Sequence, residues 1–212
     1  MVNYDLLIFD LDGTLLDTSQ GIFNSVRYAE EHMGFNAVED SVLRQFVGPP
    51  PKLIYQKVYN VSEEIALEAT KKHREYAKTK AICEAKPYPK VRETLSRLKN
   101  SGYKLAVATL KSQTIAETVL RVNGLYDLFD VIVGMDEKES LTKCETILLV
   151  LEKIGKQEKA LMIGDSLFDF EGAIEAKVDF VGVLYGFGFQ EGQRYKFDTI
   201  VKFEDLYEYL MR

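Results

Sequence analysis

Apolar and polar positions along the chain form two kinds of segment, short apolar runs and longer amphipathic stretches. The amphipathic stretches have helical spacing, and a glycine follows three of them (Gly102, Gly124 and Gly155), as expected of helix C-caps. The apolar runs are typical of buried strands: Leu6 to Phe9, Lys104 to Thr109, Val131 to Gly134, Ala160 to Gly164, Phe180 to Leu184 and Thr199 to Val201. Strands that alternate with helices predict an α/β fold, with a parallel sheet covered by helices on both faces.

The amphipathic stretches predict which residues face the sheet. The expected buried faces are Val91, Leu95 and Leu98, then Ile115, Val119 and Val122, and then Ile147, Leu148 and Leu151.

Residues 19–85 interrupt the alternation, because they have helical periodicity and no convincing strand. Two expected helical faces are Ile22, Val26, Ala29 and Met33, and Ile65, Ala69 and Tyr76. The turn Gly48-Pro49-Pro50-Pro51 divides the segment into halves, and Lys86-Pro87-Tyr88-Pro89 returns the chain to the alternating pattern. We therefore expect an α/β core formed by 1–18 and 86–212, and a small helical cap formed by 19–85 and joined by two linkers.

Composition narrows the choice of partners and compartment. The 212 residues, 46% of them hydrophobic, are enough for one sizeable core, and no apolar run approaches the ~20 residues of a membrane helix. The first ten residues are too short and too acidic for a secretory signal, and two cysteines form no disulfide framework, so we expect a cytoplasmic protein. The net charge of -6, without a basic stripe, argues against a nucleic-acid polymer as partner.

Two acids end the first apolar run. Asp10 and Asp12 are two residues apart on an extended backbone, so their carboxylates point the same way, and Gly13 lets the chain turn directly behind them. An ordinary Asp-Gly turn is the simpler interpretation of this pair. Two anions held together repel each other, however, and a divalent cation resolves the repulsion, so the sequence also permits a metal site here.

Further polar residues lie at the carboxyl ends of other predicted strands, where open parallel sheets bind their ligands. Thr109 ends the second strand, Asp165 and Asp169 follow the strand from Ala160, and Lys143 opens a predicted helix. Taken singly, Thr109 is more often a loop hydroxyl, and Lys143 is more often a solvated surface charge. Their order along the chain, together with Asp10 and Asp12, favours a common site.

In this order the four pieces resemble the motifs of the haloacid dehalogenase-like (HAD) hydrolases: Asp-x-Asp-Gly-Thr after a strand, Thr or Ser after an apolar strand, a lysine opening a helix, and Gly-Asp-x-x-x-Asp. The resemblance covers nearly the whole chain and implies a Rossmann-like parallel sheet with an inserted cap. It implies that Asp10 attacks phosphorus and carries an aspartyl phosphate, and that Asp12 is the acid-base.

The same resemblance implies a Mg²⁺ ion as cofactor. Asp10, Asp165 and the backbone carbonyl of Asp12 would hold the ion, and Asp169 would hold a water bound to it. Thr109 and Lys143 would bind the remaining phosphoryl oxygens, with Leu110 beside them in contact with substrate.

Several features resemble the phosphoglycolate phosphatase and 5'-nucleotidase branch of the family: the acid at position 12, the helical insertion after the first motif, the stretch Leu43 to Pro50 and the stretch Val183 to Gly188. This resemblance implies a phosphatase of a small phosphorylated metabolite. The chain departs from the family pattern at Cys144, where many relatives have proline, and at Lys90, where the family often has glycine.

Two cations flank the Gly-Pro-Pro-Pro turn. Arg44 and Lys52 could reach the distal part of a substrate when the cap shuts, or they could be surface charges. The two histidines, His32 and His73, have no partner spacing, and we expect them to be structural or exposed.

Two other functions stay open at this point. A phosphomutase of the same superfamily would return the phosphoryl group to substrate instead of water. A binding protein would hold a phosphorylated ligand without turnover, although such a protein has no use for a second acid beside the first.

Overall fold

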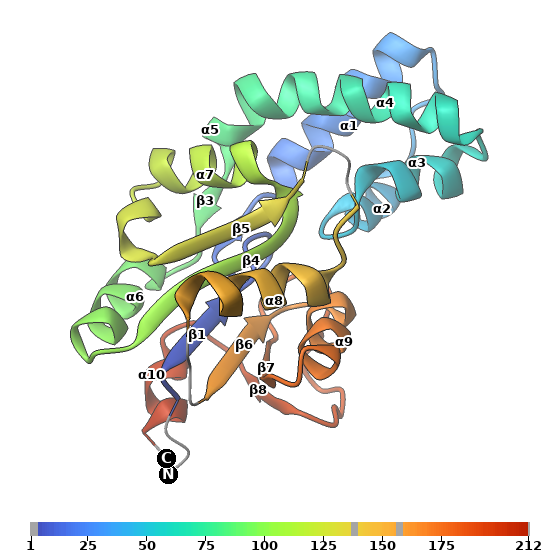
Figure 1. The fold of residues 1–212 in the computed structure, drawn as a ribbon. Helices are drawn as coiled ribbons and strands as arrows, with labels where there is room; N and C mark the ends of the chain where they lie inside the picture. Colours follow the sequence, from blue (N-terminus) through green and yellow to red (C-terminus); the bar gives the residue numbers. More distant parts are fainter. Residues whose placement is uncertain (1–3, 137–139, 156–158, 212) are drawn as a thin grey trace.

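The computed structural model describes residues 4–136, 140–155 and 159–211, and its centre is a six-stranded parallel sheet. The strands lie in the order β5-β4-β1-β6-β7-β8 (Figure 1). Their bounds are β1 Leu6–Phe9, β4 Lys104–Ser112, β5 Val131–Met135, β6 Ala160–Gly164, β7 Asp179–Val183 and β8 Asp198–Ile200. The predicted α/β fold with a parallel sheet is confirmed, and β4 runs three residues beyond the predicted end at Thr109.

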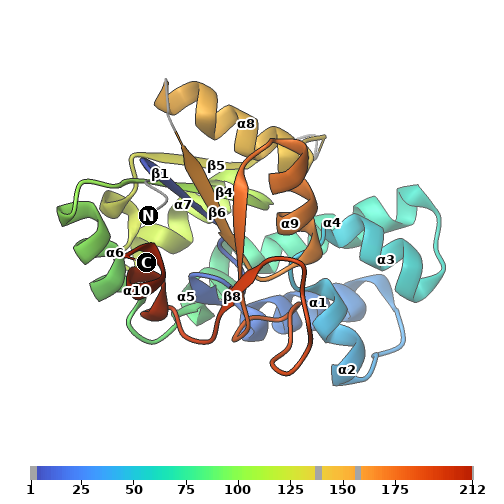
Figure 2. The ribbon, with the colours of Figure 1, turned by 90° about the horizontal axis from the view of Figure 1, so that it is seen from below.

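Helices cover both faces of the sheet (Figure 2). One face packs on α6 (Val91–Asn100), α7 (Gln113–Val122) and α10 (Asp205–Leu210), and the other on α8 (Lys143–Ile154) and α9 (Leu167–Glu175). A short 3-10 helix, η3 (Tyr126–Leu128), follows α7. Alternate side chains of β1 enter the two layers, and all four are fully buried. A strand buried on both sides has to be apolar throughout, which explains the run Leu6 to Phe9.

Three residues that the sequence places on shared apolar helical faces are exposed. Val122 is 54% exposed because it is the last residue of α7, whose buried face is Ile115, Ala116, Val119 and Leu120. Leu148 and Ile65 are also exposed, because α8 and α4 (Glu63–Tyr76) turn the residues next to them, Ile147 and Ala66, toward the interior.

Residues 19–85, called here the helical insertion, lie beyond the carboxyl ends of the strands (Figure 1). Its helices are α1 (Ser19–Met33), α2 (Asp40–Leu43), η1 (Arg44–Phe46), α3 (Pro51–Tyr59), α4, a π-helical turn η2 (Ala77–Ala81) and α5 (Ile82–Glu84). They enclose a hydrophobic cluster of their own, built on Ile22, Val26, Phe46, Tyr55 and Ala69 among others. Every residue from 19 to 85 is described, and none of them forms a strand, as the periodicity predicts.

The two linkers to the insertion pair with each other. Leu16–Asp17 (β2) and Lys86–Pro87 (β3) form a two-stranded antiparallel ribbon that the sequence does not predict. Just beyond it, Lys90 adopts a left-handed backbone conformation with φ of 63°. This region favours glycine, so Lys90 bears a backbone cost here that glycine would avoid.

In the part of the chain that the structure describes, every helix is too short or too polar to cross a bilayer.

Candidate active site

Three neighbouring strands bring the predicted acids and the predicted threonine together. Phe9, the last residue of β1, lies opposite Val107 of β4 and Ile163 of β6. The next residues along these strands therefore lie side by side near the carboxyl ends of the strands, where the strand order reverses. Asp10, Asp12, Thr109, Asp165 and Asp169 are all buried at these ends, although each is polar. Burial of this much carboxylate is costly unless the charges are compensated.

Two helix N-termini supply the other groups. Thr142 and Glu145 form a reciprocal capping box at the start of α8, which makes Lys143 its first residue. Ser166 and Asp169 do the same for α9: Asp169 Oδ2 accepts hydrogen bonds from the Ser166 backbone N–H at 3.0 Å and from its hydroxyl at 2.7 Å. Local sequence thus determines where both helices begin and fixes the positions of Lys143 and Asp169.

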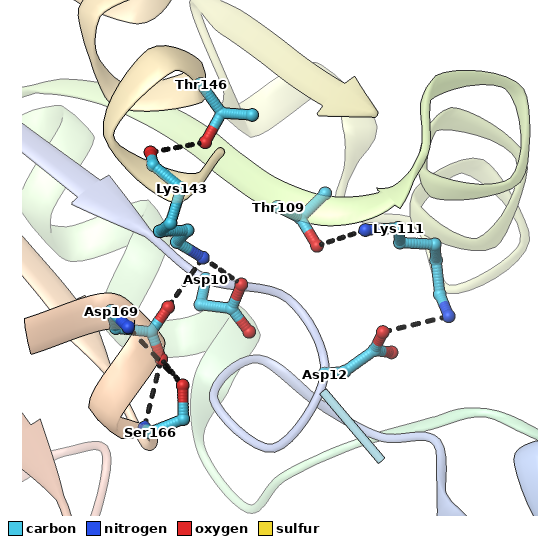
Figure 3. A network of polar contacts seen from close by, with 8 residues as sticks. All are labelled: Asp10, Asp12, Thr109, Lys111, Lys143, Thr146, Ser166 and Asp169. Carbon is cyan, nitrogen blue, oxygen red and sulfur yellow. Dashed lines mark hydrogen bonds and ion pairs between the residues drawn. The ribbon is translucent and has the colours of Figure 1, made fainter. Parts of the chain in front are cut away.

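Lys143 lies between Asp10 and Asp169 (Figure 3). Its Nζ forms ion pairs with Asp10 Oδ1 and, at 2.6 Å, with Asp169 Oδ1. Burial alone would lower the pKa of Lys143, but the two carboxylates outweigh burial and raise it, so the amine stays charged. For Asp10, burial is the largest cause of a pKa well above its ordinary value; Lys143 opposes the shift and neighbouring carboxylates add to it.

The donor set fits a divalent cation. Asp10, Asp165 and Asp169 each offer a carboxylate oxygen, and these oxygens lie within 4.8 Å of one another. Lys143 compensates one of the three negative charges, which leaves an excess of two when all three are ionised. Carboxylate oxygens are the ligands that Mg²⁺ prefers, and a charge of +2 would balance the cluster.

Asp165 is held tightly by the backbone around it. Its Oδ2 accepts a hydrogen bond from the Phe187 backbone N–H at 2.7 Å. A Cβ atom at Gly186 would lie 2.5 Å from the same oxygen, and one at Gly13 would lie 2.7 Å from the Asp165 carboxyl carbon, so only glycine fits at both positions. Burial, with the charge of Asp169, raises the pKa of Asp165 to about 7.

Asp12 turns away from this cluster toward Lys111 (Figure 3). Lys111 Nζ lies 2.9 Å from Asp12 Oδ2, and the Lys111 side chain is only 16% exposed. The backbone N–H of Lys111 donates to the hydroxyl of Thr109 at 3.2 Å. Asp12 Oδ1 is buried without a protein hydrogen-bond partner among the described residues, so it can exchange a hydrogen bond with a bound molecule.

A pocket between the sheet edge and the insertion adjoins Asp12, with a cavity volume of about 60 Å³. Its core side includes Leu110, Lys111 and Ser112, and its insertion side includes Phe46, Pro49, His73 and Arg74. His73 is buried and its Nδ1 lies 3.3 Å from the Tyr55 hydroxyl, so of the two predicted alternatives the structural one holds and the exposed one does not. Burial, with the charges of Lys111 and Arg74, lowers the pKa of His73 to about 3, so its ring is neutral at physiological pH.

The sequence predicts no catalytic or binding role for Lys111 and Arg74, and it predicts a structural or exposed His73. For Lys111 a signal was present: it follows Thr109 by two residues, which is the spacing that pairs Asp10 with Asp12. The predicted substrate contacts Arg44 and Lys52 lie elsewhere. Arg44 is exposed, Lys52 pairs with Glu63 at 3.0 Å, and neither lines the pocket beside Asp12.

A family model described as haloacid dehalogenase-like hydrolase matches residues 7–183. The chain belongs to this family. The match runs from within β1 to the end of β7 and includes the site residues Asp10, Asp12, Thr109, Lys143, Asp165 and Asp169. The HAD resemblance drawn from the motifs is thus confirmed.

Individual relatives agree with the family assignment. The chain is 33% identical over 195 residues to a 5'-nucleotidase of Pseudomonas aeruginosa, a match that covers 91% of this chain and 88% of the relative. It is 29% identical to a phosphoglycolate phosphatase of Aquifex aeolicus, a match that covers 86% of this chain and 85% of the relative. A crystal structure of a Clostridium acetobutylicum protein described as a predicted phosphatase superposes with a TM-score of 0.90, 35% identity and 99% of both chains covered.

Proposed function

We propose that this HAD-like hydrolase is a Mg²⁺-dependent phosphatase that removes the phosphoryl group from a small phosphorylated metabolite through an aspartyl phosphate. The observation that carries the proposal is the convergence of buried carboxylates around Lys143, with Asp10 directly after β1 (Figure 3). The names of the relatives, a 5'-nucleotidase and a phosphoglycolate phosphatase, support the same reaction class.

Asp10 is the nucleophile in this scheme. One carboxylate oxygen of Asp10 forms a bond to phosphorus as the bond from phosphorus to the leaving oxygen breaks. Lys143, held by Asp10 and Asp169, and the hydroxyl of Thr109 bind phosphoryl oxygens, where negative charge is stabilised in the transition state. Leu110 lines the same small cavity as Thr109 and Lys143 and contacts the bound group.

Asp12 is the acid-base. It gives a proton to the departing alcohol oxygen and then takes one from the water that attacks the aspartyl phosphate. Oδ1 of Asp12, which lacks a protein partner among the described residues, is the oxygen available for this exchange. Lys111 holds the other oxygen at 2.9 Å and so orients the carboxylate.

Asp10 and Asp165, with the backbone carbonyl of Asp12, would hold Mg²⁺, and Asp169 would orient a water beside it. When bound, the ion supplies positive charge that neutralises the nucleophile and a phosphoryl oxygen. The excess of two negative charges that the cluster carries when its three carboxylates are ionised supports a divalent ion.

We also propose that the helical insertion acts as a cap over the site, with the β2–β3 ribbon as its hinge region. Gly48 of the insertion lines the cavity around Asp10, and the neighbouring pocket of about 60 Å³ lies between the insertion and the sheet. The two cations that line the pocket, Lys111 and Arg74, favour a leaving group that carries an anionic group of its own.

Substitution of the two acids tests the proposal. Asp10→Asn should abolish hydrolysis of p-nitrophenyl phosphate with Mg²⁺ present while the protein stays folded, and Asp12→Asn should be nearly as severe. Asp127→Asn, an exposed carboxylate in η3, controls for the loss of one charge and should keep full activity. Substantial turnover by Asp10→Asn would remove the nucleophile assignment. Entry of ¹⁸O from water into the released phosphate separates a phosphatase from a phosphomutase.

A further inference from the structure

Phe187 contacts both the candidate metal site and the helical insertion. Its backbone N–H donates to Asp165 Oδ2 at 2.7 Å, so its main chain belongs to the candidate metal site. Its ring packs against the hydrophobic cluster of the helical insertion. Among the described residues assigned to that cluster or packed on it, Phe187 is the one that lies outside 19–85.

The segment around Phe187 is anchored before it by Tyr185, whose hydroxyl donates to the Thr14 carbonyl at 2.8 Å, and at Phe187 itself by the N–H and the ring. Gly186 and Gly188 flank Phe187, and both are required because their backbone passes so close to Asp165 and Ser166 that a Cβ atom would collide. Glycines permit close approach but leave the chain conformationally free. The next anchor along the chain is Phe189, which is buried and donates its backbone N–H to the Asp165 carbonyl at 2.9 Å.

The ring of Phe187 also reaches the first motif. A Cβ atom at Gly13 would lie 2.7 Å from Phe187 Cδ2, so the ring lies directly on the turn that follows Asp12. The side chain therefore fills the space between this turn and the apolar interior of the insertion. A movement of the insertion away from the sheet would remove one wall of that space.

From these contacts we infer that Phe187 is a positioning residue that couples the placement of the helical insertion to the orientation of Asp165. With the insertion closed, apolar contact holds the ring and keeps the Phe187 N–H on the Asp165 carboxylate. With the insertion displaced, the ring loses this contact, the glycine-flanked segment relaxes, and Asp165 loses a hydrogen bond that orients it. Hydrogen bonds of this kind, from neighbours of a metal ligand, tune metal affinity.

The coupling has to act in both directions, because linkage between two equilibria is reciprocal. Closure of the insertion raises the affinity for a divalent cation, and binding of the cation favours closure. The inference rests on the proposed function, since it takes Asp165 as a ligand of Mg²⁺.

The test compares Phe187→Ala with a matched control, Phe23→Ala. Phe23 lies in α1 and packs against the same cluster, but it has no bond to Asp165. Binding of Mg²⁺ alone is measured by titration calorimetry, and hydrogen exchange in 19–85 is followed with and without Mg²⁺. Phe187→Ala should weaken Mg²⁺ binding by roughly tenfold and abolish the protection that Mg²⁺ gives the insertion. Phe23→Ala should change neither result, and Phe187→Leu, which keeps an apolar side chain, should retain most of the affinity.

Each other outcome has a definite meaning. Wild-type affinity in Phe187→Ala, or equal weakening in Phe187→Ala and Phe23→Ala, would overturn the coupling. Asp165→Asn separates this failure from failure of the proposed function. If Asp165→Asn binds Mg²⁺ as the wild type does, the metal site itself is wrong. If Asp165→Asn loses Mg²⁺ while Phe187→Ala keeps it, the coupling alone is refuted.

Discussion

Gly13→Ala places a methyl group against the carboxyl group that we assign to the metal. Gly13 has φ of 84°, and a Cβ atom there would lie 2.7 Å from the carboxyl carbon of Asp165. Carbon atoms in ordinary contact are about 3.5–4.0 Å apart, so the Asp165 carboxyl group has to retreat by about 1 Å. A displacement of this size in a catalytic arrangement costs on the order of 100-fold in rate, equal to about 2.7 kcal/mol of barrier.

The chain offers a matched control for this substitution. Gly192 has φ of 86°, and nothing lies within 4 Å of the Cβ position there. Both alanine variants therefore bear the cost of a left-handed backbone, about 1–2 kcal/mol of stability, but only Gly13→Ala disturbs Asp165.

The assay measures kcat with p-nitrophenyl phosphate at saturating Mg²⁺, together with the free energy of unfolding in urea. We expect Gly13→Ala to lose about 1–3 kcal/mol more stability than Gly192→Ala, because its methyl group is also overpacked, and to have a rate about 100-fold lower than Gly192→Ala. If the two variants have kcat values within twofold of each other, the close approach of Gly13 to Asp165 has no catalytic importance and the reasoning fails.

Two further predictions concern the pocket beside Asp12. Lys111→Met should lower kcat/KM for 2-phosphoglycolate by roughly 10- to 100-fold more than for p-nitrophenyl phosphate, because the lost charge contributes about 1.5–3 kcal/mol to binding a second anionic group. Equal effects on both substrates would contradict this role. His73, whose pKa is about 3 in the folded state and 6.5 unfolded, takes up a proton on unfolding as pH falls below 6.5, so its contribution to stability is lost between pH 6.5 and 3. Between pH 7 and 5, the wild type should lose about 2 kcal/mol more unfolding free energy than His73→Gln does, as measured by urea denaturation. Equal losses in the two proteins would refute this prediction.

The sequence alone determined the core of the fold and the acids of the candidate site. Strands buried on both faces must be apolar along their whole length, so β1 and β6 are recognisable as continuous runs that end at an acid. Parallel strands leave the sheet at one edge, so Asp10 and Asp165 could be placed together without coordinates. The capping boxes at Thr142 and Ser166 are local too, which is why the helices of Lys143 and Asp169 begin where they do.

Tertiary packing decided the features that depend on contact between distant segments. His73 looked like an ordinary helical residue until the fold placed it in a pocket beside Lys111. The exposure of Arg44 and the Lys52–Glu63 pair likewise depend on how the insertion packs. The β2–β3 ribbon has only two residues in each strand, too few to produce an alternating pattern.

Phe187 shows the physical reason most directly. Its backbone N–H donates to Asp165 while its ring packs against the insertion, and neither partner is near it in sequence. Periodicity and motif spacing report on contacts within one strand, helix or turn. The meeting of the insertion with the sheet edge is set by the shapes of two packed surfaces, and these exist only in the folded chain.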